Sequence, residues 1–529
     1  MRGSGARAGR PVPAGCNDRR DGRRPRVERH HGRRAASVLR VAGTAAAAVL
    51  ISLAAPRALA AQDPLLDAVR SGDRAAVRTL LDRRADANAA AADGTTALHV
   101  AIEQNDRELV DLLIRAGARV STPNRYGIAP LHVAATVGSA PIVQALLDAG
   151  ADPRTATPEG ETALMAAART GDAATVTLLV SRGADVRAVE SWKGQTALMW
   201  AAAENNTAAL SVLIEAGADV GGTSKGGVFT PFLFAVRAGH VDASRILLDA
   251  GADAHAAMND GTSPLVLALI NGHYELASFL LDRGADPNAD GQGWTALHQI
   301  AWTRRPNTGF NLPGAVATGG LNSLELVRKL VKMGADVNAR QTREPRDGFR
   351  NQLNRIGATP FLLAAKAVDL PLMRVLLELG ADATIPTDDG TTALMAAAGV
   401  GIWAPGENPG TDDEAIVALK IAYDAGSTDV NAVNANGDTA MHGAVYRAGS
   451  IAMLRFLLEK GARPDVVNKK GWTPLIAADG VEYTPNVLKR YPEAAAFLRQ
   501  ALAERGLPVP APLDNPPGNR PIASSAAAQ

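Results

Sequence analysis

Gly94-Thr95-Thr96-Ala97-Leu98-His99 is one copy of a short pattern that recurs along most of this 529-residue chain. The pattern is a glycine, any residue, threonine, alanine or proline, and then an apolar residue. Copies place the apolar residue at positions 98, 131, 164, 198, 232, 265, 297, 361, 394, 441 and 475. Because most copies lie 32 to 34 residues apart, the sequence indicates a repeat array and not a set of independent domains.

The residues of each copy predict a pair of helices. Threonine favours a helix start because its hydroxyl accepts a hydrogen bond from the first turn, and proline at the next position costs no hydrogen bond. Alanine runs such as Ala166-Ala167-Ala168 leave room for close helix packing. Apolar residues at helical spacing, as in Ile246-Leu247-Leu248, predict a second helix. The recurring glycine after it suits a left-handed helix end.

These features resemble those of the ankyrin repeat family, from near Asp63 to near Gly506. The resemblance implies an all-α solenoid of helix–turn–helix units with hairpin-like fingers, stacked in a curved array. Residues 61–505 then hold about twelve units, with an atypical helix pair at 65–85 and a closing amphipathic helix at 491–506. Longer intervals predict insertions near 303–320, 340–356 and 402–413, and the Pro/Ala-rich segment 506–529 predicts a disordered tail.

The first sixty residues have a different composition. Their formal charge is +10, and because the whole chain is at +1, the remainder is at −9. Arginines precede an apolar run at 41–55, and Ala58-Leu59-Ala60 follows, which predicts an arginine-rich leader with a signal peptide cleaved after Ala60. An uncleaved anchor is the alternative, although the run is short for a membrane span. We also expect translation to start near Val38, which would give a signal of ordinary length.

The sequence offers little material for catalysis. Histidines of the repeat occupy a position where other copies have methionine, so we interpret them as packing and capping residues. No zinc-binding, phosphate-binding or nucleophile motif is present, and the single cysteine, Cys16, lies in the leader. We therefore expect no catalytic residues, no cofactor and no metal. The charge of −9 argues against nucleic acid as a partner.

The resemblance to ankyrin repeats places certain positions around the threonine on the concave surface. Aromatic and polar residues at those positions are the candidates for contact with a protein partner. They are Phe229, Arg237, Ile270, Asn271, Trp294, Trp302, Tyr446 and Trp472. Exposed aromatic side chains there would be unsatisfied apolar surface unless a partner, or equally a neighbouring insertion, covers them.

The insertion at 340–356 carries five arginines against two acids. Arg343, Arg346 and Arg350 could dock an acidic or carboxylate-bearing partner, because the planar guanidinium suits carboxylates. A solvated insertion without a binding role is the alternative.

Together these observations predict an exported, monomeric, non-enzymatic ankyrin scaffold, periplasmic or secreted, that binds another protein through its concave face. No membrane span is expected after signal cleavage. One alternative is an enzyme, or a subunit covering one, with chemistry in the C-terminal insertions. Its only material is Asp412-Asp413-Glu414, Glu344 and Asp347. A secreted effector is a further alternative.

Overall fold

The chain divides into two units, residues 1–60 and 61–529. The computed structural model describes residues 63–305, 316–345, 352–402, 409–484 and 487–512, with backbone alone for 482–484 and 487–488. The leader, residues 306–315, 346–351 and 403–408 of the three insertions, and 513–529 of the tail lie outside the described residues. The described part contains 24 α-helices and one short β-hairpin.

Helices follow one another in pairs, and the two members of a pair differ in their neighbours. The first helices are α1 (Pro64–Arg70), α3 (Ala97–Glu103), α5 (Pro130–Val137), α7 (Ala163–Thr170), α9 (Ala197–Ala203), α11 (Pro231–Ala238), α13 (Pro264–Ile270), α15 (Ala296–Thr303), α17 (Pro360–Lys366), α19 (Ala393–Ala398), α21 (Ala440–Ala448) and α23 (Pro474–Asp479). The second helices are α2 (Arg74–Asp82), α4 (Arg107–Arg115), α6 (Ala140–Asp148), α8 (Ala173–Ser181), α10 (Thr207–Glu215), α12 (Val241–Asp249), α14 (Tyr274–Asp282), α16 (Ser323–Lys332), α18 (Leu370–Glu378), α20 (Asp412–Asp424), α22 (Ile451–Glu459) and α24 (Pro492–Glu504).

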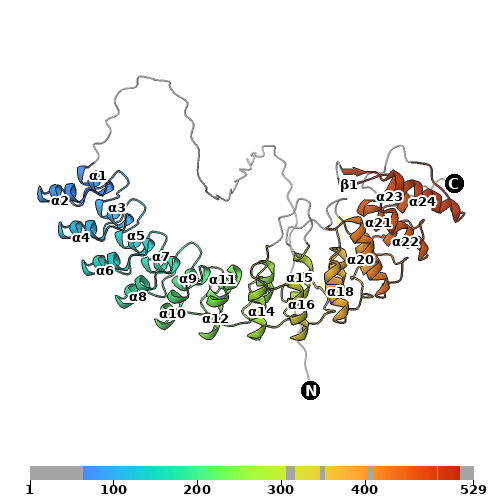
Figure 1. The fold of residues 1–529 in the computed structure, drawn as a ribbon, viewed down its shortest axis with the longest axis horizontal. Helices are drawn as coiled ribbons and strands as arrows, with labels where there is room; N and C mark the ends of the chain where they lie inside the picture. The colour runs from blue at the N-terminus through green and yellow to red at the C-terminus, as the bar shows by residue number, and fades with distance from the viewer. Residues whose placement is uncertain (1–62, 306–315, 346–351, 403–408, 485–486, 513–529) are drawn as a thin grey trace, which may run out of the picture. The chain divides into compact units, whose positions relative to one another are not determined.

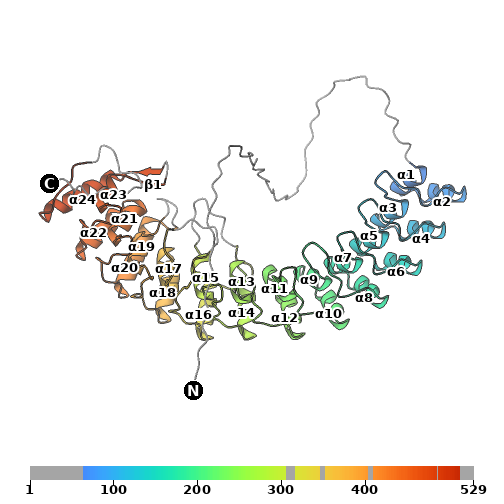
Figure 2. The same cartoon turned by 180° about the vertical axis from the view of Figure 1, so that it is seen from behind.

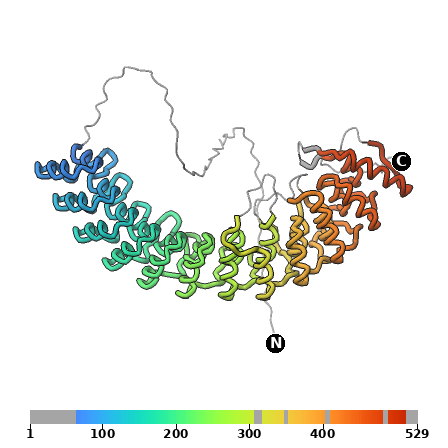
Figure 3. Tube along the Cα trace, viewed as in Figure 1, coloured from blue at the N-terminus to red at the C-terminus, as the bar shows by residue number. Residues whose placement is uncertain are grey.

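Each first helix contacts its own second helix and the first helix of the next pair, and the second helices also contact in sequence. Two parallel rows of helices result, seen from opposite sides in Figures 1 and 2 and as a continuous trace in Figure 3. Within this unit the first helices and the fingers lie on the inner side of the stack (Figure 1). The predicted all-α solenoid is confirmed.

One element departs from the all-helical expectation. Strands β1 (Val481–Thr484) and β2 (Val487–Lys489) form an antiparallel hairpin between α23 and α24, with Val481 paired to Lys489. The hairpin replaces the turn that elsewhere joins the two helices of a pair. The closing helix predicted at 491–506 is present as α24, and Leu498 on it is buried.

The helix starts follow the predicted threonine chemistry. Thr162 accepts a hydrogen bond at its hydroxyl from the backbone N–H of Met165 at 3.2 Å, and Thr230 does the same for Leu233. Ala129, which replaces threonine, caps nothing with its side chain, but Pro130 follows it and has no N–H to satisfy. The sequence pattern therefore sets the first residue of each first helix from α3 onward, whereas Asp63 caps α1.

The alanines and glycines serve the stacking in different ways. Ala134, Ala135 and Ala167 are completely buried, so the first helices approach closely through small side chains. Gly117, just after α4, has a φ of +90°, and no atom lies within 4 Å of where a Cβ would stand. The need for glycine there is conformational, because the left-handed backbone that ends the helix disfavours L side chains.

The repeat histidines join neighbouring units. At His298, Nδ1 accepts a hydrogen bond from the backbone N–H of Thr295 at 3.2 Å, and Nε2 lies 3.0 Å from the carbonyl oxygen of Ala358 in the next unit. His99 and His442 repeat this arrangement. Protonation of Nδ1 would place two donors face to face. Burial lowers the pKa of His298 to about 4, and the predicted packing and capping role is confirmed.

Lys366, at the end of α17, is a buried cation. Its side chain is 4% exposed, and Nζ donates to the carbonyl oxygen of Val400 at 3.0 Å. Burial, and next the nearby guanidinium of Arg447, lower the pKa of Lys366 well below its usual value. The ammonium of Lys366 therefore loses its proton more readily in the folded state than in the unfolded state.

Acidification should destabilise the array through the histidines. The folded pKa of His298 is about 4 against 6.5 for the free group, so the folded state binds fewer protons between these values. Stability is then complete above pH 6.5 and falls as the pH drops through this window, by on the order of 3 kcal/mol for His298. In urea titrations followed by circular dichroism, His298→Met should flatten this fall. His255→Met, at an exposed finger residue, is the control; an unchanged profile in His298→Met would contradict the interpretation.

Lys366 should make the stability of the array depend on pH in the alkaline range. Because its folded pKa lies below 10.5, the unfolded state binds the extra proton, and wild-type stability should rise with pH toward 10.5 by up to about 1.4 kcal/mol per unit. Lys366→Met, which carries no proton, should show a smaller rise between pH 7 and 10. The exposed Lys332→Met is the matched control, and equal slopes in both variants and the wild type would refute the assignment.

Candidate functional site

A large hollow on the inner face runs across the fingers and first helices from α5 to α11. Its volume is about 1060 Å³, and we call it the aromatic groove. Its lining residues are Arg125, Tyr126, Ile128, His132, Thr136, Thr157, Pro158, Glu159, Glu161, Arg169, Glu190, Trp192, Lys193, Gln195, Met199, Trp200, Ala203, Glu204, Phe234 and Arg237.

Two aromatic side chains stand out from the fingers into solvent. Trp192 is 72% exposed and Tyr126 is 65% exposed. Trp200, on α9, is half-buried, and its Nε1 donates to Oε1 of Gln195 at 3.0 Å. The guanidinium of Arg169 lies 4.8 Å from the centre of the Trp200 ring. The groove therefore presents large apolar surfaces, and the indole N–H of Trp200 is already hydrogen-bonded.

Backbone geometry holds the Trp192 finger in place. The carboxylate of Glu190 accepts hydrogen bonds from the backbone N–H groups of Trp192 at 2.7 Å, Lys193 at 2.8 Å and Gln195 at 2.9 Å. Glu190 itself is 6% exposed. Because these contacts satisfy the charge internally, Glu190 orders the loop and does not act as a free acid.

A second cluster adjoins the groove at α11. Phe229 and Phe234 lie with ring centres 5.2 Å apart, and the guanidinium of Arg237 lies 5.0 Å from the first ring and 5.2 Å from the second. Two of the predicted contact residues, Phe229 and Arg237, are thus brought together. Phe234, which the repeat pattern assigns to the core, is buried but still borders the groove.

The next predicted residues along the chain lie outside the groove. Ile270 is 39% exposed at the end of α13, and Asn271 donates from Nδ2 to the carbonyl oxygen of Leu267 at 2.9 Å. Trp294 is half-buried, with Nε1 donating to Gln299 at 2.9 Å. Ile270 remains an exposed apolar residue on this face.

Trp302 illustrates coverage by an insertion. The guanidinium of Arg355 lies 4.2 Å from the centre of the Trp302 ring, and Arg355 is 4% exposed. Arg355 also contacts Glu344 at 3.2 Å. The chain therefore covers this tryptophan with its own 340–356 insertion, which was one of the two outcomes left open.

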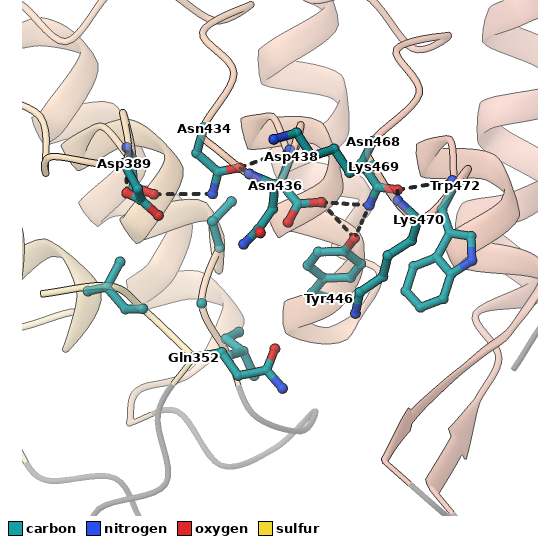
Figure 4. Close-up of a pocket in the computed structure, with 15 residues that line it drawn as sticks. Gln352, Asp389, Asn434, Asn436, Asp438, Tyr446, Asn468, Lys469, Lys470 and Trp472 are labelled. Carbon is teal, nitrogen blue, oxygen red and sulfur yellow. Dashed lines mark hydrogen bonds between the residues drawn. The ribbon is translucent and has the colours of Figure 1, made fainter. Parts of the chain in front are cut away.

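The expectation that Tyr446 and Trp472 are exposed is wrong. Trp472 is 2% exposed and Tyr446 is 8% exposed. The hydroxyl of Tyr446 donates to Asp438 at 2.9 Å and accepts from Asn468 at 3.0 Å (Figure 4). Asn468 of the next finger contacts Tyr446, and Lys470 of the same finger lies over the Trp472 ring at 4.7 Å.

These residues border a small cavity of about 250 Å³ in the C-terminal part (Figure 4). Asn434, Asp438 and Asn468 line it, and each is engaged in finger hydrogen bonds: Asn434 with Thr391 at 3.2 Å and Asp438 with Asn468 at 2.8 Å. Burial lowers the pKa of Lys470 at its edge. The polar lining stabilises the fingers.

The basic insertion is only partly described. Arg343 is exposed and donates from Nη1 to the carbonyl oxygen of Gly291 at 3.3 Å. Arg340 pairs with Asp388 at 2.6 Å. Arg346 and Arg350 lie outside the described residues, so the docking role predicted for this segment stays a prediction.

The described acids of the insertions pair with nearby arginines or lie at the start of a helix. Glu414 completes a capping box with Thr411 at the start of α20 and pairs with Arg305 at 3.1 Å. Glu344 pairs with Arg355, and Asp347 lies outside the described residues. Asp412 and Asp413 occupy the first turn of α20, where the helix dipole favours negative charge.

The described ranges hold no group of three histidine, cysteine or acidic side chains that could bind a metal ion. In the same ranges no helix has both the length and the apolar character needed to cross a bilayer.

Sequence reasoning missed Tyr126, Trp192 and Trp200. Tyr126 and Trp192 lie at finger tips, four and five residues before the first residues of α5 and α9, whereas the expected contact positions are the one just before the threonine and those seven and eight residues after it. An aromatic residue among the glycines and polar residues of a finger was the available signal. The repeat pattern assigns Trp200, four residues after Thr196, to the core, but the side chain is half-buried and borders the groove.

Comparisons with known proteins agree with this architecture. A family model of three ankyrin repeats matches residues 65–157, 131–224, 209–291 and 232–308, and a model of one ankyrin repeat matches 436–469. The chain is 32% identical over 152 residues to the neurogenic locus notch homolog protein 1 of Xenopus tropicalis. That match spans 25% of this chain and 6% of the relative. The matched models cover more than half of the chain, which belongs to the ankyrin repeat family.

Proposed function

We propose that this protein is an exported, monomeric scaffold of about twelve ankyrin units that binds a protein partner through the aromatic groove. Ankyrin repeats are generally protein–protein interaction modules. The observation that carries the proposal is the solvent-exposed Trp192, 72% exposed beside Trp200 on an ordered finger. A large apolar side chain held in water is typical of a binding surface.

The mechanism is presentation of preformed side chains. Adjacent fingers are joined by backbone hydrogen bonds: Arg125 N–H donates to Asp93 at 2.8 Å, Ser191 to Glu159 at 2.7 Å and Lys225 to Lys193 at 2.7 Å. The finger tips therefore form one continuous surface and not a row of independent loops. Because the side chains are ordered before binding, less conformational entropy is lost when a partner docks.

Tryptophan and arginine are the residues that most often dominate binding energy at protein interfaces. The groove places Trp192, Trp200 and Arg237 on one face, with Tyr126 at its other end. Its polar residues lie around these rings, as in the rim of an interface. This composition supports a protein partner over a small apolar ligand.

Binding should depend on the exposed tryptophan. With a partner identified by affinity purification and then purified, Trp192→Ala should raise the dissociation constant at least tenfold in calorimetry, because a central aromatic contact is lost. Helical content should not change, since Trp192 lies outside the helices. Val467→Ala, at an exposed finger residue away from the groove, is the matched control. Equal affinities of wild type and Trp192→Ala would remove this groove from the interface.

Export should leave a defined N-terminus. If residues 1–60 act as a signal, the protein purified from the periplasm or medium should begin at Ala61 and contain no cysteine. N-terminal sequencing and intact mass measure this directly. A chain that retains the leader, or that fractionates with the cytoplasm, would contradict the export part of the proposal and leave the binding part unaffected.

A further inference from the structure

The aromatic groove ends beside α11 in a smaller hollow of about 400 Å³, which we call the basic hollow. Its lining residues are Trp192, Lys193, Gln195, Ser224, Lys225, Phe229, Phe234 and Arg237. The set contains three cations, three aromatic rings and no carboxylate. We propose that the basic hollow binds a segment of the partner protein that is acidic and also carries an apolar side chain. This inference rests on the proposed function.

In the described part of the chain, the three cations contact aromatic rings or a carbonyl oxygen but no acid. Arg237 lies over Phe229 and Phe234, and Nζ of Lys193 lies 4.5 Å from the centre of the Trp192 ring. Lys225 contacts the carbonyl oxygen of Ser191 at 3.5 Å. All three are exposed, and within the described residues none of them forms an ion pair with a carboxylate. Stacking on a ring restrains a cation without neutralising it.

Three exposed arginines on the second-helix row behave differently. Arg182 pairs with Asp148 at 2.7 Å, Arg283 pairs with Asp249, and Arg328 pairs with Glu378 at 2.7 Å, each across neighbouring units. For these three arginines the protein supplies an acid from an adjacent unit, whereas the residues that line the basic hollow include no acid. A partner that brings carboxylates would complete the same kind of pair.

The aromatic rings add an apolar requirement. Trp192 is largely exposed, Phe229 is half-buried, and Phe234 forms the floor. A ligand that matched the charge alone would leave these rings in water. An acidic segment with an aromatic or aliphatic residue between its carboxylates satisfies both features.

Rings and cations together also suit single-stranded nucleic acid, but the surroundings favour a peptide. Residues 61–529 carry a charge of −9, and Glu159, Glu161 and Glu204 line the adjoining groove. The phosphates of a nucleic acid long enough to bind would be repelled by these acids. A short acidic segment places its negative charge only in the hollow.

Selection from a displayed library of random twelve-residue peptides, followed by fluorescence anisotropy with the full chain, tests the proposal. Selected peptides should be enriched in aspartate and glutamate, and a glutamine-substituted copy should bind at least tenfold more weakly. The triple variant Lys193→Gln, Lys225→Gln, Arg237→Gln should lose at least tenfold in affinity. Arg182→Gln, Arg283→Gln, Arg328→Gln, which removes the same charge from the outer row, should stay within twofold.

The outcomes separate this inference from the proposed function. Peptides without acidic enrichment that still lose affinity in Trp192→Ala would overturn the inference and support the groove. Equal binding to the charge variant and the wild type would also overturn it. A labelled oligothymidylate that binds more tightly than the peptides, and is lost in the same variant, would replace the acidic peptide by nucleic acid. Selection of no peptide would count against both.

Discussion

The rest of the structure depends on the contact between successive first helices. No single helix pair can bury its apolar face, so each unit is stable only against its neighbours. Alanines such as Ala134 and Ala167 let the helices approach closely, and they are completely buried. Histidines at the helix starts add a directional link, because Nε2 of His298 contacts a carbonyl oxygen in the following unit. Apolar packing and hydrogen bonding thus act at one interface, repeated along the chain.

The fingers inherit their order from this stacking. Their tips are joined by backbone hydrogen bonds such as that from Ser191 to Glu159, and Glu190 fixes the turn that carries Trp192. The exposed side chains of the groove are therefore held by a network that lies behind them. The residues of the fingers can differ between proteins of this fold while the helix contacts stay the same. The fold alone therefore does not identify the partner.

The insertions show how a local change is absorbed by the array. The 340–356 segment places Arg355 against Trp302, and Arg305, just after α15, pairs with Glu414 of α20. The hairpin of β1 and β2 joins α23 to α24 near the end of the array. The contact between Arg355 and Trp302 shows that the chain itself covers part of the expected partner surface.

The sequence by itself determined the repeat, the helix starts at threonine, the glycine-ended helices and the structural role of histidines such as His298, because these follow from local chemistry repeated at a fixed period. It also placed Phe229 and Arg237 on one face. Only the tertiary structure decided which aromatic rings meet solvent. Trp472 and Tyr446 are buried, whereas Trp192 is 72% exposed. Exposure depends on how residues some thirty positions apart are brought together by the stacking, and no pattern within one unit contains that information.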